Sequence, residues 1–267
     1  MLKNESPSAD PRPLYQPKRY YTHSGASCLT SYYFGGRVSQ LPFGLYTKDP
    51  NRNPNEGETL RLVERYTSIP APLWVDDYQS TCPVLIMTAA PGEPLDEVFH
   101  RLSYSERKQL STDLKNALSQ LLSIPNQTFH LFSNSHGGPL FDYRFPSGVC
   151  GPFHHISDFN SFLVHKHVLN ETKKDIAAVH ARQYRSIFTH ADLQPRNIII
   201  DEGRLSGIVD WECTGFYPEY WDFTKFFYTV RATWEIQFVI FEAFAGEEYE
   251  EELGAERLLW RDTPFGC

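Results

Sequence analysis

The chain has 267 residues, of which 41% are apolar, and its 33 acidic and 25 basic residues give a net charge of −8. This composition is that of an ordinary globular protein and excludes a chain that is disordered throughout. The acidic balance excludes a nucleic-acid binder that relies on bulk positive charge, and no apolar run is long enough to cross a membrane.

The N-terminus and the cysteines favour a cytoplasmic protein. The five cysteines are widely spaced, odd in number and without a CxxC pair, which favours free thiols in a reducing compartment. The N-terminus lacks the apolar segment of a secretory signal. Residues 1–18 are rich in proline and polar side chains and are predicted to be a flexible tail. Residues 19–267 are predicted to form one domain of two lobes, divided near residue 90.

Strands are predicted in two parts of the small lobe. The segment SQLPFGLYTK, residues 39–48, predicts a pair of strands broken at Pro42 and Gly44. The continuous apolar run at 84–87 is consistent with a buried strand.

One helix is predicted between these strands. A turn-rich loop at 51–55 precedes it, and residues 56–67 carry Leu60 and Val63 on one side. Prolines at 70 and 72 end this helix. The turn AAPGEPL, which follows the buried strand, is predicted to join the two lobes.

The large lobe is predicted to be mainly helical. Ser103 and Glu106 form a capping box at the start of a long helix, which Pro125 ends. Its apolar face comprises Leu110, Leu114, Ala117, Leu118 and Leu121. Residues 125–152 are predicted to be a loop. Further helices are predicted over 157–180 and within 222–259.

The segment HADLQPRN, residues 190–197, carries the strongest functional signal. It lies between two short apolar strands and contains Asp192 and Asn197, and the next strand ends at Asp210. A hairpin of these strands would bring the three side chains to one rim. An isolated Asp-x4-Asn is usually a capped turn, but the order of the whole set favours a functional site.

Such a rim suits phosphoryl transfer. An amide oxygen and a carboxylate are ligands that Mg²⁺ accepts, with phosphate and water completing its shell. A second carboxylate that does not bind the metal can orient a hydroxyl and accept its proton, so positioning and charge neutralisation carry the reaction.

HADLQPRNIII followed by GIVDWECTGFYPEYWD resembles the signature of the aminoglycoside phosphotransferase family, which includes relatives of choline kinases and has a protein-kinase-like fold. The resemblance extends over residues 38–265. It is nearest to the fungal-type branch, through TSIPAP at 67–72 and GPF at 151–153. It implies an α+β fold with a small N-terminal sheet lobe that includes a helix, and a larger, mainly helical C-terminal lobe.

The resemblance also assigns roles to this segment. It implies Asp192 as the catalytic base, Asn197 and Asp210 as magnesium ligands, and Asp222 as a structural acidic residue. His190 resembles the structural histidine of the family's loop. Ala191 departs from the family, which has glycine there; a positive φ would strain alanine, and we expect no such φ at this position.

For the nucleotide, the resemblance points to the small lobe and the joint. Lys48 and Glu56 resemble the family's phosphate-binding lysine and its helix glutamate, with Glu58 as the rival partner. The text MTAAPG at 87–92 resembles the family's joint segment. It implies that backbone groups of Thr88 and Ala90 bond the adenine.

The phosphate loop is the weakest part of the pattern. The chain has no GxGxxG, and the candidates before the lysine are Gly35-Gly36 and Gly44, either of which could be a plain hairpin turn.

The histidine pairs and the acidic run near the C-terminus are expected to have no catalytic role. The histidine pairs His154-His155 and His165-x-His167 have poor spacing for metal binding and are expected to be surface or packing residues. The acidic run GEEYEEELGAE at 246–256 is expected to be a solvated helix face, with attraction of a cationic substrate as the alternative.

The sequence therefore predicts an ATP-dependent phosphotransferase that moves the γ-phosphoryl group to a hydroxyl of a small molecule, with Mg²⁺. Its partners would be ATP and this acceptor, without nucleic acid or membrane. A degenerate kinase fold that only binds or scaffolds is the main rival. A protein kinase is disfavoured because Asp-Phe-Gly and Ala-Pro-Glu are both absent. No motif identifies the acceptor.

Overall fold

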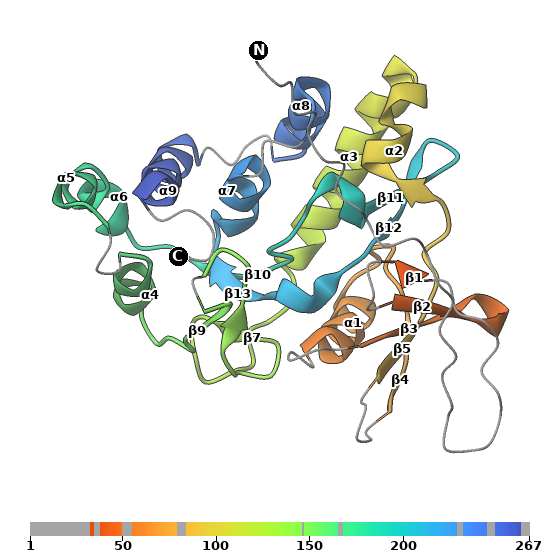
Figure 1. Cartoon of the computed structure of the whole chain (residues 1–267), viewed down its shortest axis with the longest axis horizontal. Coiled ribbons are helices and arrows are strands. Elements are labelled where there is room, and N and C mark those ends of the chain that lie inside the picture. Colours follow the sequence, from red (N-terminus) through yellow and green to blue (C-terminus); the bar gives the residue numbers. More distant parts are fainter. Residues whose placement is uncertain are drawn as a thin grey trace, which may run out of the picture.

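The computed structural model describes residues 33–34, 38–49, 55–78, 84–145, 147–164, 168–228, 232–244 and 249–262. The predicted tail at 1–18, the Gly35-Gly36 candidate and the pair His165-x-His167 lie outside these ranges. Figure 1 shows the small-lobe sheet and one helix on one side of the molecule and the mainly helical lobe on the other. The predicted two-lobed α+β fold is therefore confirmed.

The small lobe is built on one antiparallel sheet in the order β1-β2-β3-β5-β4. Its strands are β1 (Tyr33–Phe34), β2 (Val38–Leu41), β3 (Leu45–Lys48), β4 (Trp74–Tyr78) and β5 (Val84–Thr88). The strand pair and the buried strand predicted from sequence are confirmed. Strand β4 was not predicted, because it is an edge strand in which two adjacent aspartates interrupt the apolar pattern.

Helix α1 (Asn55–Tyr66) lies between this sheet and the large lobe. Its apolar side is the predicted one, because Leu60 and Val63 are each only 1% exposed. Asn55, predicted to end a loop, is instead the first helical residue. Arg61 fastens the helix to β4, since its guanidinium stacks 3.8 Å from the Trp74 ring centre.

The joint between the lobes is pinned to the large lobe. Strand β6 (Glu93–Pro94) pairs with β11 (Ile198–Asp201), which also forms a hairpin with β12 (Arg204–Ile208). Gly92 has φ +111°, and a Cβ there would lie 2.2 Å from the carbonyl oxygen of Ile200. The crossing chain therefore approaches the hairpin closely enough to require glycine.

Helix α3 (Tyr104–Leu121) follows the short turns α2 (Leu95–Val98) and η2 (Phe99–Arg101). Both hydrogen bonds of the predicted capping box between Ser103 and Glu106 are present. Four of the five predicted apolar positions are buried, and the fifth, Leu118, is partly buried against the same core. Here the local pattern specified the helix fully.

The region 125–180 differs most from the prediction. Three short strands occur in the predicted loop: β7 (Ser133–Asn134), β8 (Leu140–Phe141) and β9 (Val149–Cys150). The single helix predicted over 157–180 is wrong, because the chain forms α4 (Ile156–Leu163), α5 (Asn170–Asp175) and α6 (Ala177–His180).

Tertiary contacts explain this break. Val164 leaves the helical conformation, with φ −89° and ψ 59°. Before α5, the backbone N–H of Leu169 donates to Asp262 Oδ2 of helix α9 (Glu250–Asp262) over 3.0 Å. A partner far along the chain therefore fixes where the new helix begins, and the hydrophobic period of 157–180 contains no signal for it.

The remaining elements complete the large lobe. Strand β10 (Ser186–Thr189) pairs with β13 (Gly215–Pro218), which also pairs with β7. The one-turn helices η3 (Pro195–Asn197) and η4 (Trp211–Cys213) follow β10 and β12 respectively. The predicted C-terminal helical part consists of α7 (Trp221–Tyr228), α8 (Trp234–Ala243) and α9. No helix of the described ranges is long and apolar enough to cross a membrane.

The acidic run at 246–256 lies only partly in the described ranges. There, arginines neutralise several of its carboxylates: Arg182 pairs with Glu251 and Glu252, and Arg144 pairs with Glu256 in the protein interior. Glu252 and Glu256 are buried. The expectation of a wholly solvated face is therefore wrong for these two residues, because one side of α9 faces the interior, where Glu256 pairs with the buried Arg144 and Glu252 accepts hydrogen bonds from Arg182 and Tyr184.

Gly92→Ala is expected to destabilise the protein more than Gly44→Ala. Gly44 also has a positive φ, +70°, but a Cβ there has open space, so its alanine variant bears only backbone strain of about 1–2 kcal/mol. Alanine at 92 adds a clash with backbone, worth about 1–3 kcal/mol more. Urea unfolding of both variants measures the difference. Equal losses would show that the joint is not held against the β11–β12 hairpin.

Candidate active site

A buried lysine is surrounded by three carboxylates where the two lobes meet. Lys48, the last residue of β3, places its Nζ 2.6 Å from Glu56 Oε2 on α1. The same Nζ lies 2.5 Å from Asp210 Oδ1 and 3.5 Å from Glu212 Oε2, both contributed by the large lobe after β12. The predicted contact between Lys48 and Glu56 is present. The rival Glu58 pairs with Arg61 instead.

This cluster has excess negative charge. One ammonium and three carboxylates give a formal charge of −2. Burial by itself lowers the pKa of Lys48, but the charges of Glu56, Asp210 and Glu212 outweigh it and raise the pKa, so the lysine stays protonated. Burial raises the pKa of Glu56, and the Lys48 charge opposes that rise. The cluster therefore favours the approach of further positive charge.

Hydrogen bonds from both lobes hold the cluster. The backbone N–H of Trp211 donates to Glu56 Oε1 over 3.1 Å, and the Tyr143 hydroxyl donates to Glu212. Asn55 at the start of α1 donates to the carbonyl of Thr214 over 2.7 Å. The sequence analysis assigned no role to Glu212, although it stands in the quoted Asp-Trp-Glu text, and no local signal marked Asn55.

The side chain of Asp222 on α7 binds the backbone of the HADLQPRN loop. Its two carboxylate oxygens accept the backbone N–H groups of His190 over 3.0 Å and Ala191 over 2.7 Å. Burial raises the pKa of Asp222 to about 6, while these two N–H groups oppose the rise. The structural role that the resemblance implied for Asp222 agrees with this geometry.

His190 is a fully buried, neutral part of the loop. Its Nδ1 accepts the backbone N–H of Asp192 over 3.2 Å, so the proton is on Nε2, which donates to the carbonyl of Val209 over 3.1 Å. Burial lowers its pKa to about 4. The ring therefore ties the loop to the strand that leads to Asp210 and does not act as a base.

Ala191 has φ +61°, so the expectation of an ordinary φ at this position is wrong. A left-handed alanine costs about 1–2 kcal/mol. The two hydrogen bonds to Asp222 hold the backbone in this conformation. The Ala191 side chain is fully buried in an apolar cluster of the large lobe that includes Phe159 and Tyr217. The loop therefore keeps the shape for which the family's glycine is suited.

Asp192 is buried and faces two donors of its own loop. Its Oδ2 accepts from Arg196 Nη2 over 2.9 Å and from Asn197 Nδ2 over 3.1 Å. Burial raises its pKa to about 6, and the charges of Lys225 and Arg196 limit the rise. Lys225 is itself buried and bound to Asp142. A carboxylate in this setting can accept a proton from a bound hydroxyl.

The oxygens of Asn197 and Asp210 fit Mg²⁺. Asn197 Nδ2 is used by Asp192, which leaves the amide oxygen as the group that can bind a cation. The backbone carbonyl of Asn197 accepts the backbone N–H of Val209 over 2.9 Å, which holds this loop next to the residue that precedes Asp210. Carboxylate oxygens of Glu56, Asp210 and Glu212 lie within 4.8 Å of one another. Hard oxygen donors with excess negative charge are what Mg²⁺ requires.

The joint residues Thr88 and Ala90 are only partly available to a nucleotide base. The Thr88 N–H donates to the carbonyl of Leu73 over 3.0 Å, and the Ala89 N–H donates to Gly44 over 2.8 Å. The carbonyl of Thr88 and the backbone of Ala90 are therefore the groups that could contact a base.

Gly44 is at the wrong end of β3 for a phosphate loop. Leu45 pairs with Thr88 at the joint, whereas Lys48 pairs with Val38 and Leu85 at the other end. Three residues of extended chain separate Leu45 from Lys48, about 10 Å. Gly44 is thereby removed from the phosphate-loop candidates.

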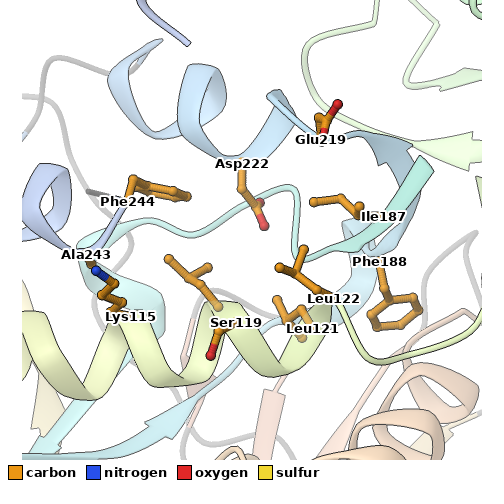
Figure 2. A pocket seen from close by; sticks show the side chains of 11 residues that line it. Lys115, Ser119, Leu121, Leu122, Ile187, Phe188, Glu219, Asp222, Ala243 and Phe244 are labelled. Atoms are coloured by element: carbon orange, nitrogen blue, oxygen red, sulfur yellow. The ribbon is translucent and has the colours of Figure 1, made fainter. Parts of the chain in front are cut away.

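A cavity of about 100 Å³ lies behind the loop, bordered by α3, β10, α7 and α8. Figure 2 shows the Asp222 side chain pointing into it between Ile187 and Phe244. Apart from Asp222, none of the residues to which the sequence analysis assigned a role in the site lines this cavity. It is therefore separate from the cluster around Lys48.

Comparison with solved structures gives the same fold. A thermostable mutant of aminoglycoside phosphotransferase APH(4)-Ia in its apo form has a TM-score of 0.60 at 15% identity, over 91% of this chain and 84% of that chain. The gentamicin–APH(2")-IIa complex has a TM-score of 0.54 at 19% identity, over 84% and 77%. Macrolide 2'-phosphotransferase MphH from Brachybacterium faecium has 0.52 at 16% identity, over 83% and 79%.

Comparison of the sequence with curated proteins gave no significant match. Comparison with protein families matches residues 42–255, most of the chain, to the phosphotransferase enzyme family, APH. This range includes Lys48, the HADLQPRN loop and the residues that follow β12. The chain therefore belongs to the phosphotransferase enzyme family.

Proposed function

We propose that this protein transfers the γ-phosphoryl group of ATP to a hydroxyl of a small molecule. The observation that carries the proposal is the meeting of Lys48 with Asp210 beside the loop that holds Asp192. Neighbouring structures support it: one is a ternary complex of an APH(4)-Ia mutant with AMP-PNP and hygromycin B, and another enzyme phosphorylates macrolides.

ATP is the donor we propose, although nucleotide use varies among the structural neighbours. APH(4)-Ia mutants are described with AMP-PNP and with ADP, whereas an aminoglycoside 2'-phosphotransferase mutant is described with GDP. The fungal-type branch and a cytoplasmic location stay predictions from the sequence.

The phosphate side of the reaction would be performed by Lys48, Asn197 and Asp210. The Lys48 ammonium would contact the nucleotide phosphates, and Glu56 would keep it in place. The oxygens of Asn197 and Asp210 would hold Mg²⁺, which when bound neutralises phosphate charge and orients the phosphoryl group.

The acceptor side would be performed by Asp192. Its carboxylate would receive the proton of the acceptor hydroxyl as the oxygen–phosphorus bond forms, and the bond from phosphorus to the leaving oxygen of ADP would break with its electron pair. The His190 ring and Asp222 would fix the loop backbone during this step. Held geometry of this kind contributes strongly to the rate because it removes the cost of orientation.

Asp192→Asn is expected to lower turnover by about 10²–10⁴-fold, the usual value of general-base assistance. ATP affinity should stay within about twofold because the amide keeps the shape of the side chain. Incubation with ATP and pooled hydroxyl compounds, followed by mass spectrometry for added phosphate, gives the rate. Asp201→Asn, an exposed aspartate at the end of β11, is the matched control. More than half the normal rate in Asp192→Asn would refute the role.

Asp210→Asn is expected to reduce the magnesium-dependent gain in ATP affinity by at least about tenfold. Asparagine tolerates the left-handed backbone at this position, where φ is 65°, so the loss can be attributed to the missing charge. Calorimetric titration of ATP with and without MgCl₂ measures the gain. An unchanged gain would exclude Asp210 as a metal ligand. Absence of any ATP binding by the wild type would support the scaffold alternative.

Glu56→Gln is expected to slow phosphoryl transfer by about tenfold, or roughly 1.4 kcal/mol, because Lys48 would lose its 2.6 Å ion-pair partner on α1. Glu58→Gln should leave the rate unchanged, since Glu58 pairs with Arg61 near the surface. Circular dichroism verifies that both variants are folded. Impairment of Glu58→Gln alone would place the phosphate-holding glutamate elsewhere on the helix.

A further inference from the structure

Arg196 lies beside the proposed base and reaches solvent. Its Nη2 is 2.9 Å from Asp192 Oδ2. The Arg196 side chain is 52% exposed, whereas that of Asp192 is 9% exposed. The arginine therefore covers the open side of a buried carboxylate.

Backbone hydrogen bonds around η3 fix the position of the Arg196 backbone. The Gln194 N–H donates to the carbonyl of Asp192 over 2.8 Å, and the Asn197 N–H donates to the carbonyl of Gln194 over 2.8 Å. Pro195 restricts the same turn. The Cα of Arg196 is thereby held between the proposed base and the proposed metal ligand Asn197.

A second cation acts on Asp192 but is differently placed. Lys225 is buried and bound to Asp142, which also accepts the indole N–H of Trp221 over 2.9 Å. Its ammonium is therefore committed within the protein. Arg196 is the exposed one of the two cations that limit the pKa rise of Asp192.

The contact with Asp192 brings the guanidinium to the side of the site where the acceptor would react. An acceptor hydroxyl on Asp192 would lie about 2.6–3.2 Å from the carboxylate, and its oxygen would be about 3–3.5 Å from phosphorus in a reactive complex. Arg196 contacts the same carboxylate at 2.9 Å. A guanidinium carries five N–H donors in a fixed plane and keeps its charge at all working pH values.

We propose, resting on the proposed function, that Arg196 is a second catalytic residue, whose guanidinium contacts the transferred phosphoryl group and stabilises its charge in the transition state. As the acceptor oxygen bonds to phosphorus, its proton passes to Asp192, and the electron pair of the broken bond leaves with ADP.

Magnesium, ADP and fluoroaluminate test this inference without knowledge of the acceptor, because the planar or octahedral fluoride complex imitates a phosphoryl group in transfer. Calorimetry of the full chain measures ADP affinity with MgCl₂, with and without AlCl₃ and NaF. The wild type should gain at least tenfold in affinity from fluoroaluminate. Arg196→Gln should lose most of that gain, while its affinity for ADP without fluoroaluminate stays within twofold of the wild type. Arg196→Lys should retain part of the gain.

Arg204→Gln is the matched control, because Arg204 is also an exposed arginine paired with an aspartate, Asp113, but lies on β12 away from the loop. It should keep the full gain. A full gain in Arg196→Gln would overturn the inference but not the proposed function. The same holds if the wild type binds ADP but gains no affinity from fluoroaluminate. Failure of the wild type to bind magnesium and ADP would instead overturn the proposed function, and the inference with it.

Discussion

The enclosure of one ammonium by three carboxylates at the meeting of the lobes is the constraint on which the rest of the site depends. Lys48 comes from the small-lobe sheet, Glu56 from α1, and Asp210 and Glu212 from the large lobe. Removal of one partner from a buried ion pair typically costs about 3–5 kcal/mol. The cluster therefore links sheet, helix and hairpin at one point, where loss of Lys48 would leave three carboxylates without a compensating charge.

In the proposed reaction, the same cluster would couple the binding of metal to the binding of nucleotide. Its formal charge of −2 would repel the phosphates of ATP unless positive charge came with them. A divalent cation held near Asp210 supplies that charge, so nucleotide and metal are expected to bind together. Lys48 would then have two roles. Its ammonium neutralises part of the carboxylate charge, and it could contact phosphate once a bound cation neutralised part of that charge.

The large lobe holds the acceptor side by a different device. Asp222 binds two successive backbone N–H groups, and this compensates for the left-handed conformation of Ala191. The neutral His190 ring links the loop to Val209, immediately before Asp210. A change at one end of this chain of hydrogen bonds would alter the positions of both Asp192 and Asp210, so the loop and the strand that leads to Asp210 form one connected unit.

The sequence by itself determined the elements whose signals are local. The capping box and apolar period specified α3, and short apolar runs indicated β2, β3, β5 and the hairpin of β11 and β12. The order of residues in HADLQPRN placed Asp192 and Asn197 in one loop. These signals act between residues a few positions apart, where chain geometry leaves few alternatives. The resemblance to phosphotransferases rested on the same short text.

Only the tertiary structure decided the contacts between distant residues. Lys48 and Asp210 are 162 positions apart, and no pattern in the sequence predicted that Glu212 and Asn55 would join the site. The start of α5 and the positive φ of Ala191 also involve distant partners, since Asp262 accepts the N–H of Leu169 and Asp222 accepts the N–H of Ala191 from other helices. A buried polar group must find a partner wherever the fold brings one, and that choice is made by packing rather than by neighbouring residues.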